Sequence, residues 1–423
     1  MSTIVISPQK LSGSIKIPPS KSDAHRAIIC AALSKGISTI KPVYLSDDIK
    51  ATIKAVSKLG AKIDLISNKL IINGENTFSK QNIIINCQES ASTLRFLIPV
   101  AAAGGVKSTF VGTGNLPSRP IGVYLNCLPK FGVNFQTNSG LPLKLSGKLR
   151  AGNYKIPGNI SSQFISGLLF ALPLLNDDST IEITNSFESS AYVDMTINTM
   201  SQFGINIETL PYGYKIPGKQ KYRPNDYIIE GDYSQAAFFI SAAILGNKIK
   251  ILGLNKNSHQ GDIKAIKIFK DFGANIKWSF NKLIISPSVL HGIKIDASQI
   301  PDLVPILAVT ACFAEGTTEI TNAARLRMKE CDRLNAISKT LNKLGANIKE
   351  TQDGLIIKGV KSLKSGTVDS FNDHRIAMAL SIAAIMANGD IRITNAQSIN
   401  KSYPTFFEDY NKLGGNSHVI DMG

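Results

Sequence analysis

Long hydrophobic runs are missing from this chain of 423 residues. Apolar stretches such as 236–245 and 376–387 stop well short of the roughly 20 residues that a membrane-spanning helix needs. The opening segment, MSTIVISPQKLSG, has no basic region followed by an apolar core, so we expect no secretory signal. These features favour a cytoplasmic protein without a membrane partner.

Cysteine is scarce and irregularly placed. The chain has five cysteines, an odd number, at positions 30, 87, 127, 312 and 331. Their spacing fits neither a zinc site nor a disulfide framework. A reducing cytoplasm is the simplest interpretation.

Negative charge is also in short supply, and the formal net charge is +16. Two explanations compete, a nucleic-acid surface and a site for small polyanions. Lysines provide most of the excess and are spread along the chain. Aromatic residues make up only 7% and are not interleaved with basic stretches, as a nucleic-acid-binding repeat protein would have them. We keep that class as an alternative and expect no nucleic-acid partner.

What the chain has in abundance is repetition. Six apolar helix patterns each end in an apolar residue and a glycine, followed by a short strand pattern; the glycines stand at 60, 132, 204, 273, 345 and 414. The intervals of 72, 72, 69, 72 and 69 residues indicate one folding unit used six times. Glycine suits a helix end where the backbone turns through a left-handed conformation.

Each unit reads as helix, strand, helix, strand and a further strand, so we expect an α/β fold. Three units make ~200 residues, a plausible domain. The stretch 213–232, rich in Pro, Gly and Lys, lies between the third and fourth units. It divides a first domain, 20–230, from a second, 231–423. Residues 1–19 are expected to form a strand pair, which local sequence assigns to neither domain.

Arginines gather at helix starts. A helix N-terminus attracts anions, so an arginine there needs another reason, such as a bound anion. Isolated Ser, Thr, Asp or Asn at such places usually only caps the helix. The segment 118–121 places an arginine before a proline at a position typical of a first helical residue. Six of the ten arginines lie at or near expected starts: Arg26, Arg95, Arg119, Arg327, Arg333 and Arg375.

Short motifs at these starts carry a family resemblance along the full length. They are PSKSxxxR at 19–26, SDD at 46–48, RPI at 119–121, SSQF at 161–164, IPD at 300–302, KExDRL at 329–334 and NDHR at 372–375. In order and spacing they resemble the 3-phosphoshikimate 1-carboxyvinyltransferases, also called 5-enolpyruvylshikimate-3-phosphate synthases. The resemblance implies two similar domains of three βαβαββ repeats, an inside-out α/β barrel arrangement, with the active site in the interdomain cleft. It also assigns residues 1–19 to the second domain.

The implied reaction belongs to the shikimate pathway of aromatic amino acid biosynthesis. The enolpyruvyl group of phosphoenolpyruvate passes to the 5-hydroxyl of shikimate 3-phosphate, and phosphate is released, through a tetrahedral intermediate. By motif, the shikimate 3-phosphate ligands are Lys21, Ser22, Arg26, Ser161, Ser162, Gln163, Ser189, Tyr192, Asp302 and Lys329. The phosphoenolpyruvate ligands are Lys21, Ala91, Arg119, Gln163, Arg333, His374, Arg375 and Lys401. No cofactor is implied, and we expect a monomer.

The resemblance makes Glu330 the acid/base at the methylene carbon and Asp302 the base at the 5-hydroxyl, with Lys21 as a third catalytic residue. Simpler readings stay open for three residues. Glu330 could form a surface ion pair with Arg327 or Arg333. Asp302 could cap a helix after Pro301, and His374 could be a buried structural imidazole.

Two departures from the family pattern affect the expectations. The loop that reads NxGTxxR in much of the family is ESASTLR at 89–95, with Ala91 where the family has a glycine beside the phosphoenolpyruvate phosphate. We therefore expect glyphosate to bind poorly. The position aligned with the family's C-terminal lysine is Gln397, and Lys401 is the candidate substitute. The sister enzyme acting on UDP-N-acetylglucosamine is the nearest rival, but its reactive cysteine has no counterpart in 112–118.

Overall fold

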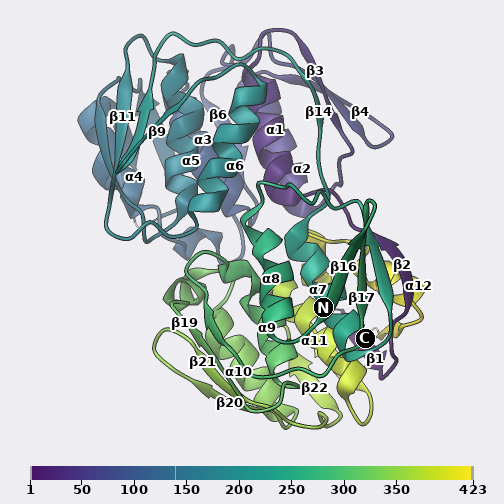
Figure 1. Ribbon diagram of the computed structural model, residues 1–423. Coiled ribbons are helices and arrows are strands. Elements are labelled where there is room, and N and C mark those ends of the chain that lie inside the picture. The colour runs from purple at the N-terminus through teal and green to yellow at the C-terminus, as the bar shows by residue number, and fades with distance from the viewer. Residues whose placement is uncertain (1, 139, 421–423) are drawn as a thin grey trace. The chain divides into compact units, whose positions relative to one another are not determined.

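The computed structural model describes residues 2–138 and 140–420 (Figure 1). The chain divides into two compact units. Unit 1 comprises Met1–Pro18 and Glu230–Gly423, and unit 2 comprises Pro19–Ile229. The described residues form six four-stranded sheets.

All six sheets share one topology. The first two strands of each are parallel, and the next two neighbours are antiparallel. A parallel pair needs a long crossover, which a single interior helix begins in four of the sheets, whereas the parallel pairs β14 with β3 and β2 with β15 join strands far apart in the chain. In unit 2 the orders are β14 (Asp226–Ile228), β3 (Ile37–Lys41), β5 (Lys69–Asn73), β4 (Lys62–Ile66); β6 (Ile83–Asn86), β7 (Ser108–Val111), β9 (Leu143–Gly147), β8 (Val133–Gln136); and β10 (Asn153–Pro157), β11 (Ser179–Thr184), β13 (Gly213–Ile216), β12 (Glu208–Leu210). In unit 1 they are β2 (Gly13–Lys16), β15 (Ile249–Leu252), β17 (Lys282–Ser286), β16 (Asn275–Ser279); β18 (Lys294–Asp296), β19 (Thr317–Thr321), β21 (Leu355–Lys358), β20 (Asn347–Glu350); and β22 (Gly366–Asp369), β23 (Ile391–Thr394), β1 (Thr3–Ser7), β24 (Asn416–Ile420).

The expected strand pair within residues 1–19 is wrong. The two strands exist but join different sheets: β1 pairs with β23 and β24, and β2 pairs with β15. Each completes a four-stranded sheet whose other members lie hundreds of residues away, as in the pair Val5 and Arg392. Strand β14 closes the first sheet of unit 2 in the same way, pairing Tyr227 with Ile40. Local sequence carries no signal for such distant partners.

Helices fill the interior of each unit, and in Figure 1 the helices of unit 2 lie between its sheets. The first helix of each repeat is buried almost all round, which marks an interior helix. These helices are α1 (Lys21–Leu33), α3 (Ala91–Ala103), α5 (Ser162–Ala171), α7 (Tyr233–Leu245), α9 (Val304–Ala311) and α11 (His374–Ala383). The second helices bury one side only: α2 (Asp47–Leu59), α4 (Gly122–Cys127), α6 (Ser190–Gln202), α8 (Lys264–Asp271), α10 (Arg333–Lys343) and α12 (Phe406–Lys412).

The glycine signature is confirmed at all six places. Each glycine has a positive φ, from 80° at Gly204 to 122° at Gly60. In this region a side chain costs free energy that glycine avoids. The repeat read from the sequence is therefore a repeat of backbone conformation.

The helix start expected at Arg119 and Pro120 is wrong. Residues Leu116–Ser118 form a separate 3₁₀ turn, and α4 begins only at Gly122. Arg119 is extended, with φ −73° and ψ 143°. A residue before proline is pushed out of the helical region, which accounts for the extended backbone of Arg119.

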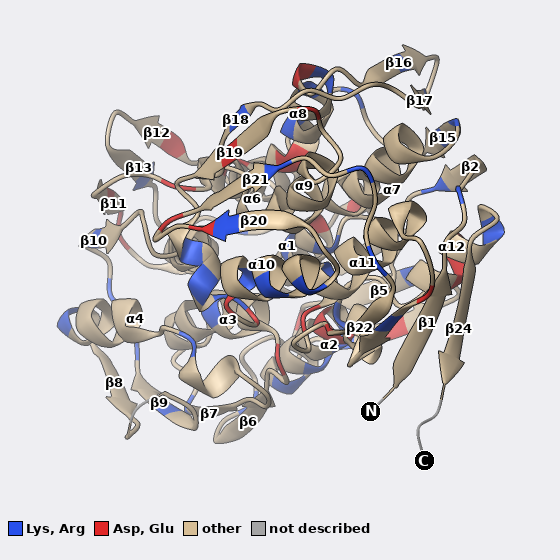
Figure 2. Ribbon diagram, turned by 90° about the horizontal axis from the view of Figure 1, so that it is seen from below, with Lys and Arg blue, Asp and Glu red and all other residues tan. Residues whose placement is uncertain are grey.

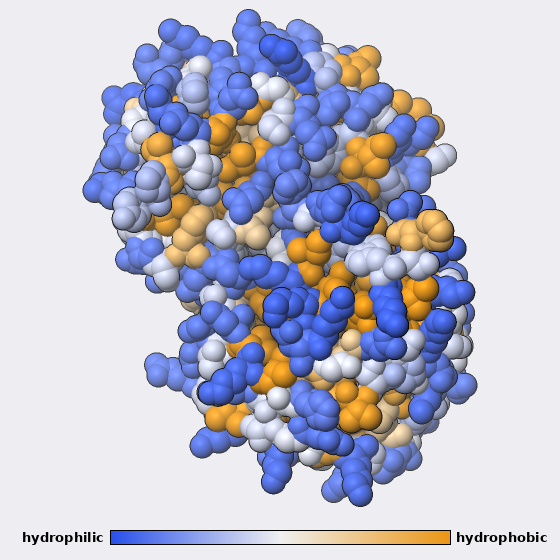
Figure 3. All heavy atoms as spheres, viewed as in Figure 1, coloured by the Kyte–Doolittle hydropathy of each residue, from blue (hydrophilic) through white to orange (hydrophobic). Residues whose placement is uncertain are grey.

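The surface is charged and mixed. Figure 2 shows Lys and Arg on helices and strands of both units rather than on one segment. In the face shown in Figure 3, hydrophilic residues predominate and apolar ones form separate small patches. Within 2–138 and 140–420, no helix has the length and apolarity to cross a bilayer.

Candidate functional site

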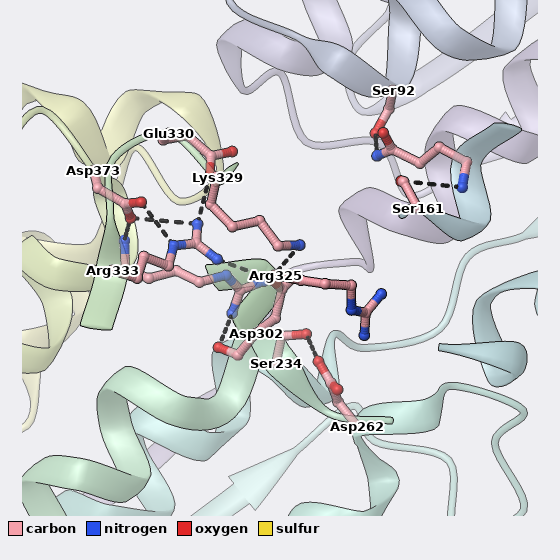
Figure 4. Close-up of polar contacts among 12 residues, drawn as sticks. Ser92, Ser161, Ser234, Asp262, Asp302, Arg325, Lys329, Glu330, Arg333 and Asp373 are labelled. Carbon is pink, nitrogen blue, oxygen red and sulfur yellow. Dashed lines mark hydrogen bonds and ion pairs between the residues drawn. The ribbon is translucent and has the colours of Figure 1, made fainter. Parts of the chain in front are cut away.

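In unit 1, three short segments bring charged side chains together (Figure 4). Asp302 lies on the 3₁₀ turn Pro301–Leu303 that leads into α9. The segment 329–333 joins the 3₁₀ turn Ala324–Met328 to α10, whose first residue is Arg333. Asp373 is the N-cap of α11. The KExDRL, IPD and NDHR motifs thus meet in one cluster, which we call the carboxylate–arginine cluster.

Arg333 is the hub of this cluster. Its side chain is 2% exposed, and its guanidinium contacts three carboxylates: Nε lies 2.7 Å from Asp373, Nη1 2.8 Å from Asp302 and Nη2 2.7 Å from Glu330. Burial alone would lower the pKa of Arg333, but the charges of Asp373, Glu330 and Asp302 outweigh it and raise that pKa well above its usual value. The guanidinium is therefore firmly charged and fixes the three carboxylates relative to one another.

Asp302 receives three cations. Besides Arg333, Lys329 Nζ lies 3.3 Å from Oδ1 and Arg375 Nη2 lies 3.0 Å from Oδ2. Burial lowers the pKa of Lys329 to about 8, although Asp302 favours its charged form. Lys329 is thus an ammonium group that can lose its proton near neutral pH.

A second acidic group lies near Asp302. Asp262, just before α8, is 2% exposed and accepts a hydrogen bond from the Ser234 hydroxyl at the start of α7 (Figure 4). Burial raises the pKa of Asp262 to about 6, and the negative charge of Asp302 adds to the shift while Arg375 opposes it. Asp262 is not among the site residues predicted from the sequence.

The remaining predicted residues of unit 1 surround the cluster. Glu330 pairs with Arg333, one of the simpler readings, whereas Arg327 pairs with Asp332 and Glu350. His374 is 2% exposed, at the first position of α11. Its imidazole is thus buried, as the structural reading also requires.

Lys401, the candidate substitute for the family's C-terminal lysine, and Gln397, the aligned position, make different contacts in the structure. Lys401 is 7% exposed, and its Nζ donates to the carbonyl oxygen of Asn372, 2.6 Å away, in the NDHR motif. The amide oxygen of Gln397 instead accepts from Ser2 at an exposed place. Only Lys401 reaches the motif of the cluster through these contacts.

In unit 2 the corresponding hub is Arg95 of α3. Its Nη1 lies 2.9 Å from the Gln163 amide oxygen and 3.4 Å from the Ser161 hydroxyl, while Nη2 donates to the Pro120 carbonyl at 2.9 Å. The Gln163 amide nitrogen in turn donates to Ser92, 2.9 Å away (Figure 4). Arg95 thus holds two predicted ligands, Ser161 and Gln163, beside the loop that carries Arg119.

Arg26 joins α1 to α6. It donates to the Thr196 hydroxyl at 2.7 Å and to the carbonyl oxygens of Ser22 and Tyr192 at 2.6 and 2.8 Å. Burial lowers the pKa of Arg26 to about 10, although Asp23 favours its charged form. Three predicted ligands, Ser22, Arg26 and Tyr192, are therefore in direct contact.

The other predicted ligands of unit 2 occupy helix starts. Lys21 opens α1 and pairs with Asp48 of α2 at 2.8 Å. Ser162 and Ala91 are the first residues of α5 and α3. Ser189, before α6, has φ +55°, an uncommon conformation for serine that often marks functional positions.

Two residues that contact several predicted site residues, Arg95 and Asp373, had no role predicted from the sequence. Arg95 stood among the arginines at helix starts but received no role. Asp373 lies inside the NDHR motif, where it resembles an ordinary cap. The unusual placement of an arginine was the one available signal for Arg95; for Asp373 there was none, because its partners come from another repeat.

Comparison with known proteins decides the family. A family model described as EPSP synthase (3-phosphoshikimate 1-carboxyvinyltransferase) matches residues 5–410. The chain belongs to the EPSP synthase family.

Individual EPSP synthases match along the whole chain. The 3-phosphoshikimate 1-carboxyvinyltransferase of Clostridium novyi (strain NT) is 50% identical over 434 residues, covering 100% of both chains. Its namesake from Clostridium perfringens (strain ATCC 13124) is 49% identical over 419 residues, covering 98% of this chain and 99% of the relative. An EPSP synthase structure from Acinetobacter baumannii aligns with a TM-score of 0.84 and 25% identity over 100% of both chains. Together with the repeated topology, these matches confirm the predicted fold class.

The clustered side chains of this EPSP synthase family member suit anions and proton transfer. Among the residues that the structure describes, no group of three or more His, Cys, Asp or Glu could hold a metal ion. Each carboxylate of the carboxylate–arginine cluster contacts a cationic side chain instead.

Proposed function

We propose that this chain transfers the enolpyruvyl group of phosphoenolpyruvate to the 5-hydroxyl of shikimate 3-phosphate and releases phosphate. One observation carries the proposal: the two carboxylates expected to move protons, Asp302 and Glu330, contact the same guanidinium, that of Arg333. Full-length relatives that are 49–50% identical bear the name of this activity. The absence of cysteine from 112–118 favours it over the sister transferase.

The reaction needs two proton transfers in each direction. In the addition step, Asp302 takes the proton of the 5-hydroxyl while the oxygen bonds to the substituted carbon of phosphoenolpyruvate. Glu330 gives a proton to the methylene carbon, which forms the tetrahedral intermediate. In the elimination step Glu330 takes a proton back from the methyl carbon, the double bond re-forms, and the carbon–oxygen bond to phosphate breaks. The proton that Asp302 took from the 5-hydroxyl leaves with the departing phosphate, so both carboxyl groups return to their starting forms. Cations close to Asp302 favour its ionised form, the form that a base must have.

In this proposal, residues of both units bind the two substrates. Hydroxyl and amide groups such as Ser161, Ser162 and Gln163 hold shikimate 3-phosphate without adding charge. Arginines bind carboxylate and phosphate groups through paired hydrogen bonds, which suits Arg119, Arg333 and Arg375 to phosphoenolpyruvate. Lys21, Lys329, His374 and Lys401 supply further cationic or donor groups.

Phosphate release tests the proposal. The wild-type protein should release phosphate from phosphoenolpyruvate only when shikimate 3-phosphate is present. In Glu330→Gln, kcat should fall by ~10²–10⁴-fold, the usual contribution of general acid–base catalysis. Glu350→Gln is the matched control, because Glu350 pairs with Arg327 outside the carboxylate–arginine cluster. No release with this acceptor would overturn the function, and equal activity of the two variants would overturn the role of Glu330.

We further propose that glyphosate inhibits this chain weakly. Ala91 is the first residue of α3 and is 5% exposed, so its methyl group is packed in place where the family has glycine. One methyl group in a tight pocket commonly changes binding by ~10–200-fold. Ala91→Gly should lower the inhibition constant of glyphosate by a factor in this range and leave the KM for phosphoenolpyruvate nearly unchanged. An unchanged inhibition constant would contradict the proposal.

The chain is also proposed to act as a cytoplasmic monomer without a nucleic-acid partner. Lys and Arg spread over helices and strands of both units (Figure 2) support the absence of a nucleic-acid partner, which a clustered basic patch would favour. Light scattering after size exclusion should give a mass near 45.6 kDa. Any retention on heparin should vanish at modest salt. A larger mass, or binding selective for one nucleic-acid sequence, would contradict these points.

A further inference from the structure

Asp373 has no role in the reaction as described, yet it is the most enclosed carboxylate of the carboxylate–arginine cluster. Its side chain is 0% exposed. Three residues donate to it: Arg333 through Nε at 2.7 Å and Nη2 at 3.4 Å, Arg375 through its backbone N–H at 2.8 Å, and Cys331 through its thiol at 3.7 Å.

The two oxygens of Asp373 make different contacts, although both accept from Arg333, Oδ1 from Nη2 at 3.4 Å and Oδ2 from Nε at 2.7 Å. Oδ1 caps α11 by accepting from the backbone N–H of Arg375. Oδ2 faces Nε of Arg333 and the Cys331 thiol. Burial raises the pKa of that thiol, so it stays protonated and can donate. One carboxylate thus fixes the backbone at Arg375 and the side chain of Arg333.

By fixing Arg333, Asp373 also affects the positions of the proposed proton-transfer groups, Asp302 and Glu330. With Nε held by Asp373, the planar guanidinium points Nη1 at Asp302 and Nη2 at Glu330. Because the group is rigid, rotating it would move both contacts at once. Active-site groups displaced by about 1 Å can cost ~10²-fold in rate.

We propose that Asp373 is a positioning residue, which orients Arg333 and through it Asp302 and Glu330. The inference rests on the proposed function. Asp373 acts through Arg333 and touches no substrate. A simple cap would stabilise α11 but have no specific effect on phosphoenolpyruvate.

Two substitutions separate the cap from the positioning role. In Asp373→Asn, the amide oxygen can still cap α11, but the amide nitrogen then faces Nε of Arg333 with a donor where an acceptor stood. In Asp373→Ser, the hydroxyl can cap as Ser20, Ser90 and Ser161 do in unit 2, but it is too short to hold the guanidinium. Both variants therefore keep a good cap and should fold.

The matched control is Asp332→Asn. Asp332 is the N-cap of α10, where it accepts from Asn335 and pairs with Arg327, so it starts the helix that carries Arg333 without touching its guanidinium. We expect kcat and both KM values of this variant to stay within about threefold of the wild type, the size of a small surface effect.

Steady-state kinetics of phosphate release are the first measurement. In both Asp373 variants the KM for phosphoenolpyruvate should rise by at least about tenfold and kcat should fall by ~10–100-fold. The KM for shikimate 3-phosphate should rise by less than the KM for phosphoenolpyruvate, because only Asp302 among its predicted ligands contacts the Arg333 guanidinium directly. Equal changes in both KM values, or wild-type kinetics, would overturn the inference. No turnover by the wild type would instead overturn the proposed function, and this inference with it.

A double-substitution cycle tests whether Asp373 acts through Arg333. Arg333→Lys keeps the charge but loses the rigid fork. If Asp373 works by orienting that fork, adding Asp373→Asn to Arg333→Lys should change kcat/KM for phosphoenolpyruvate by less than about threefold. Full additivity of the two losses would overturn the inference, because it would mean that Asp373 acts independently of Arg333.

Discussion

The two units use the same scaffold with different residues at the starts of their interior helices. In unit 2 the caps of α1, α3 and α5 are serines, and in unit 1 the caps of α7 and α11 are aspartates. Asp302, at the start of α9, continues the same spacing. The six positions are 20, 90, 161, 232, 302 and 373, so successive intervals are 70, 71, 71, 70 and 71 residues.

This difference decides what each helix start can do. A serine cap satisfies one N–H and leaves the positive end of the helix available to an external anion. An aspartate cap already supplies the anion. In unit 1 these carboxylates hold arginines: Asp373 holds Arg333, and Asp302 holds Arg333 and Arg375. The helix starts of unit 2 thus carry neutral caps, whereas in unit 1 carboxylates at equivalent positions pair with arginines.

The strongest test of the comparison replaces one buried arginine in each unit. Arg333→Gln removes the cation paired with the fully buried Asp373, a change that typically costs ~3–5 kcal/mol of unfolding free energy. Arg26→Gln removes hydrogen bonds to the neutral oxygens of Thr196, Ser22 and Tyr192, which typically costs ~1–3 kcal/mol. Urea unfolding monitored by circular dichroism should rank the two variants in this order.

Both arginines are nearly fully buried, at 1% and 3% exposure, so packing loss is matched. Their pKa values shift in opposite directions, upward for Arg333 and downward to about 10 for Arg26. Equal destabilisation of the two variants would break the comparison, since it would show that the carboxylates of unit 1 add nothing beyond neutral acceptors.

The shared scaffold could be read from the sequence, because it rests on local features repeated six times. Glycines with positive φ, polar caps and alternating strands each leave a signal within a few residues. The wrong helix start at Arg119 and Pro120 is a local failure of another kind. An extended residue followed by proline is compatible with a helix that begins at the proline, yet α4 begins two residues later, at Gly122.

The chemical difference between the units was less visible, because tertiary contacts create it. Asp373 and Ser161 read alike as caps, and only the approach of Arg333 from α10 distinguishes the aspartate. Strands β1 and β2 were expected to pair with each other, because their actual partners lie in distant repeats and leave no signal in the local sequence. The sequence motifs identified the predicted ligands, whereas the contacts of Arg95 and Asp373 could be recognised only in the folded structure.

The role of the Lys329 charge can be tested by measuring kcat/KM as a function of pH. Its pKa of about 8 means that it loses its proton as pH rises through 8. If unit 1 binds substrate through this charge, kcat/KM for shikimate 3-phosphate should fall by up to about fivefold between pH 8 and 9, as the charged fraction of Lys329 falls. Lys329→Arg stays charged and should show a flat profile over this interval.

A linked effect on stability has a definite sign. The folded pKa lies below the ordinary value of 10.5, so the unfolded chain binds this proton more tightly between about pH 8 and 10.5. Lys329 should therefore make the folded state more stable as pH rises through that interval, by a contribution that Lys329→Arg lacks. Identical pH profiles of activity in wild type and variant would rule out a binding role for the Lys329 charge.

The smallest expected effect tests whether the two units share the same backbone scaffold, rather than whether their chemistry differs. Gly60 in unit 2 and Gly414 in unit 1 end equivalent helices with φ of 122° and 89°. Alanine at either place should cost about 1 kcal/mol for the positive φ alone. At Gly414 an added Cβ meets nothing within 4 Å, whereas at Gly60 it would overlap the carbonyl oxygen of Asn76. Gly60→Ala should therefore cost a further ~1–3 kcal/mol, measured by urea unfolding. A larger loss in Gly414→Ala would mean that the two helix ends are not equivalent, and that the shared scaffold is less regular than its spacing suggests.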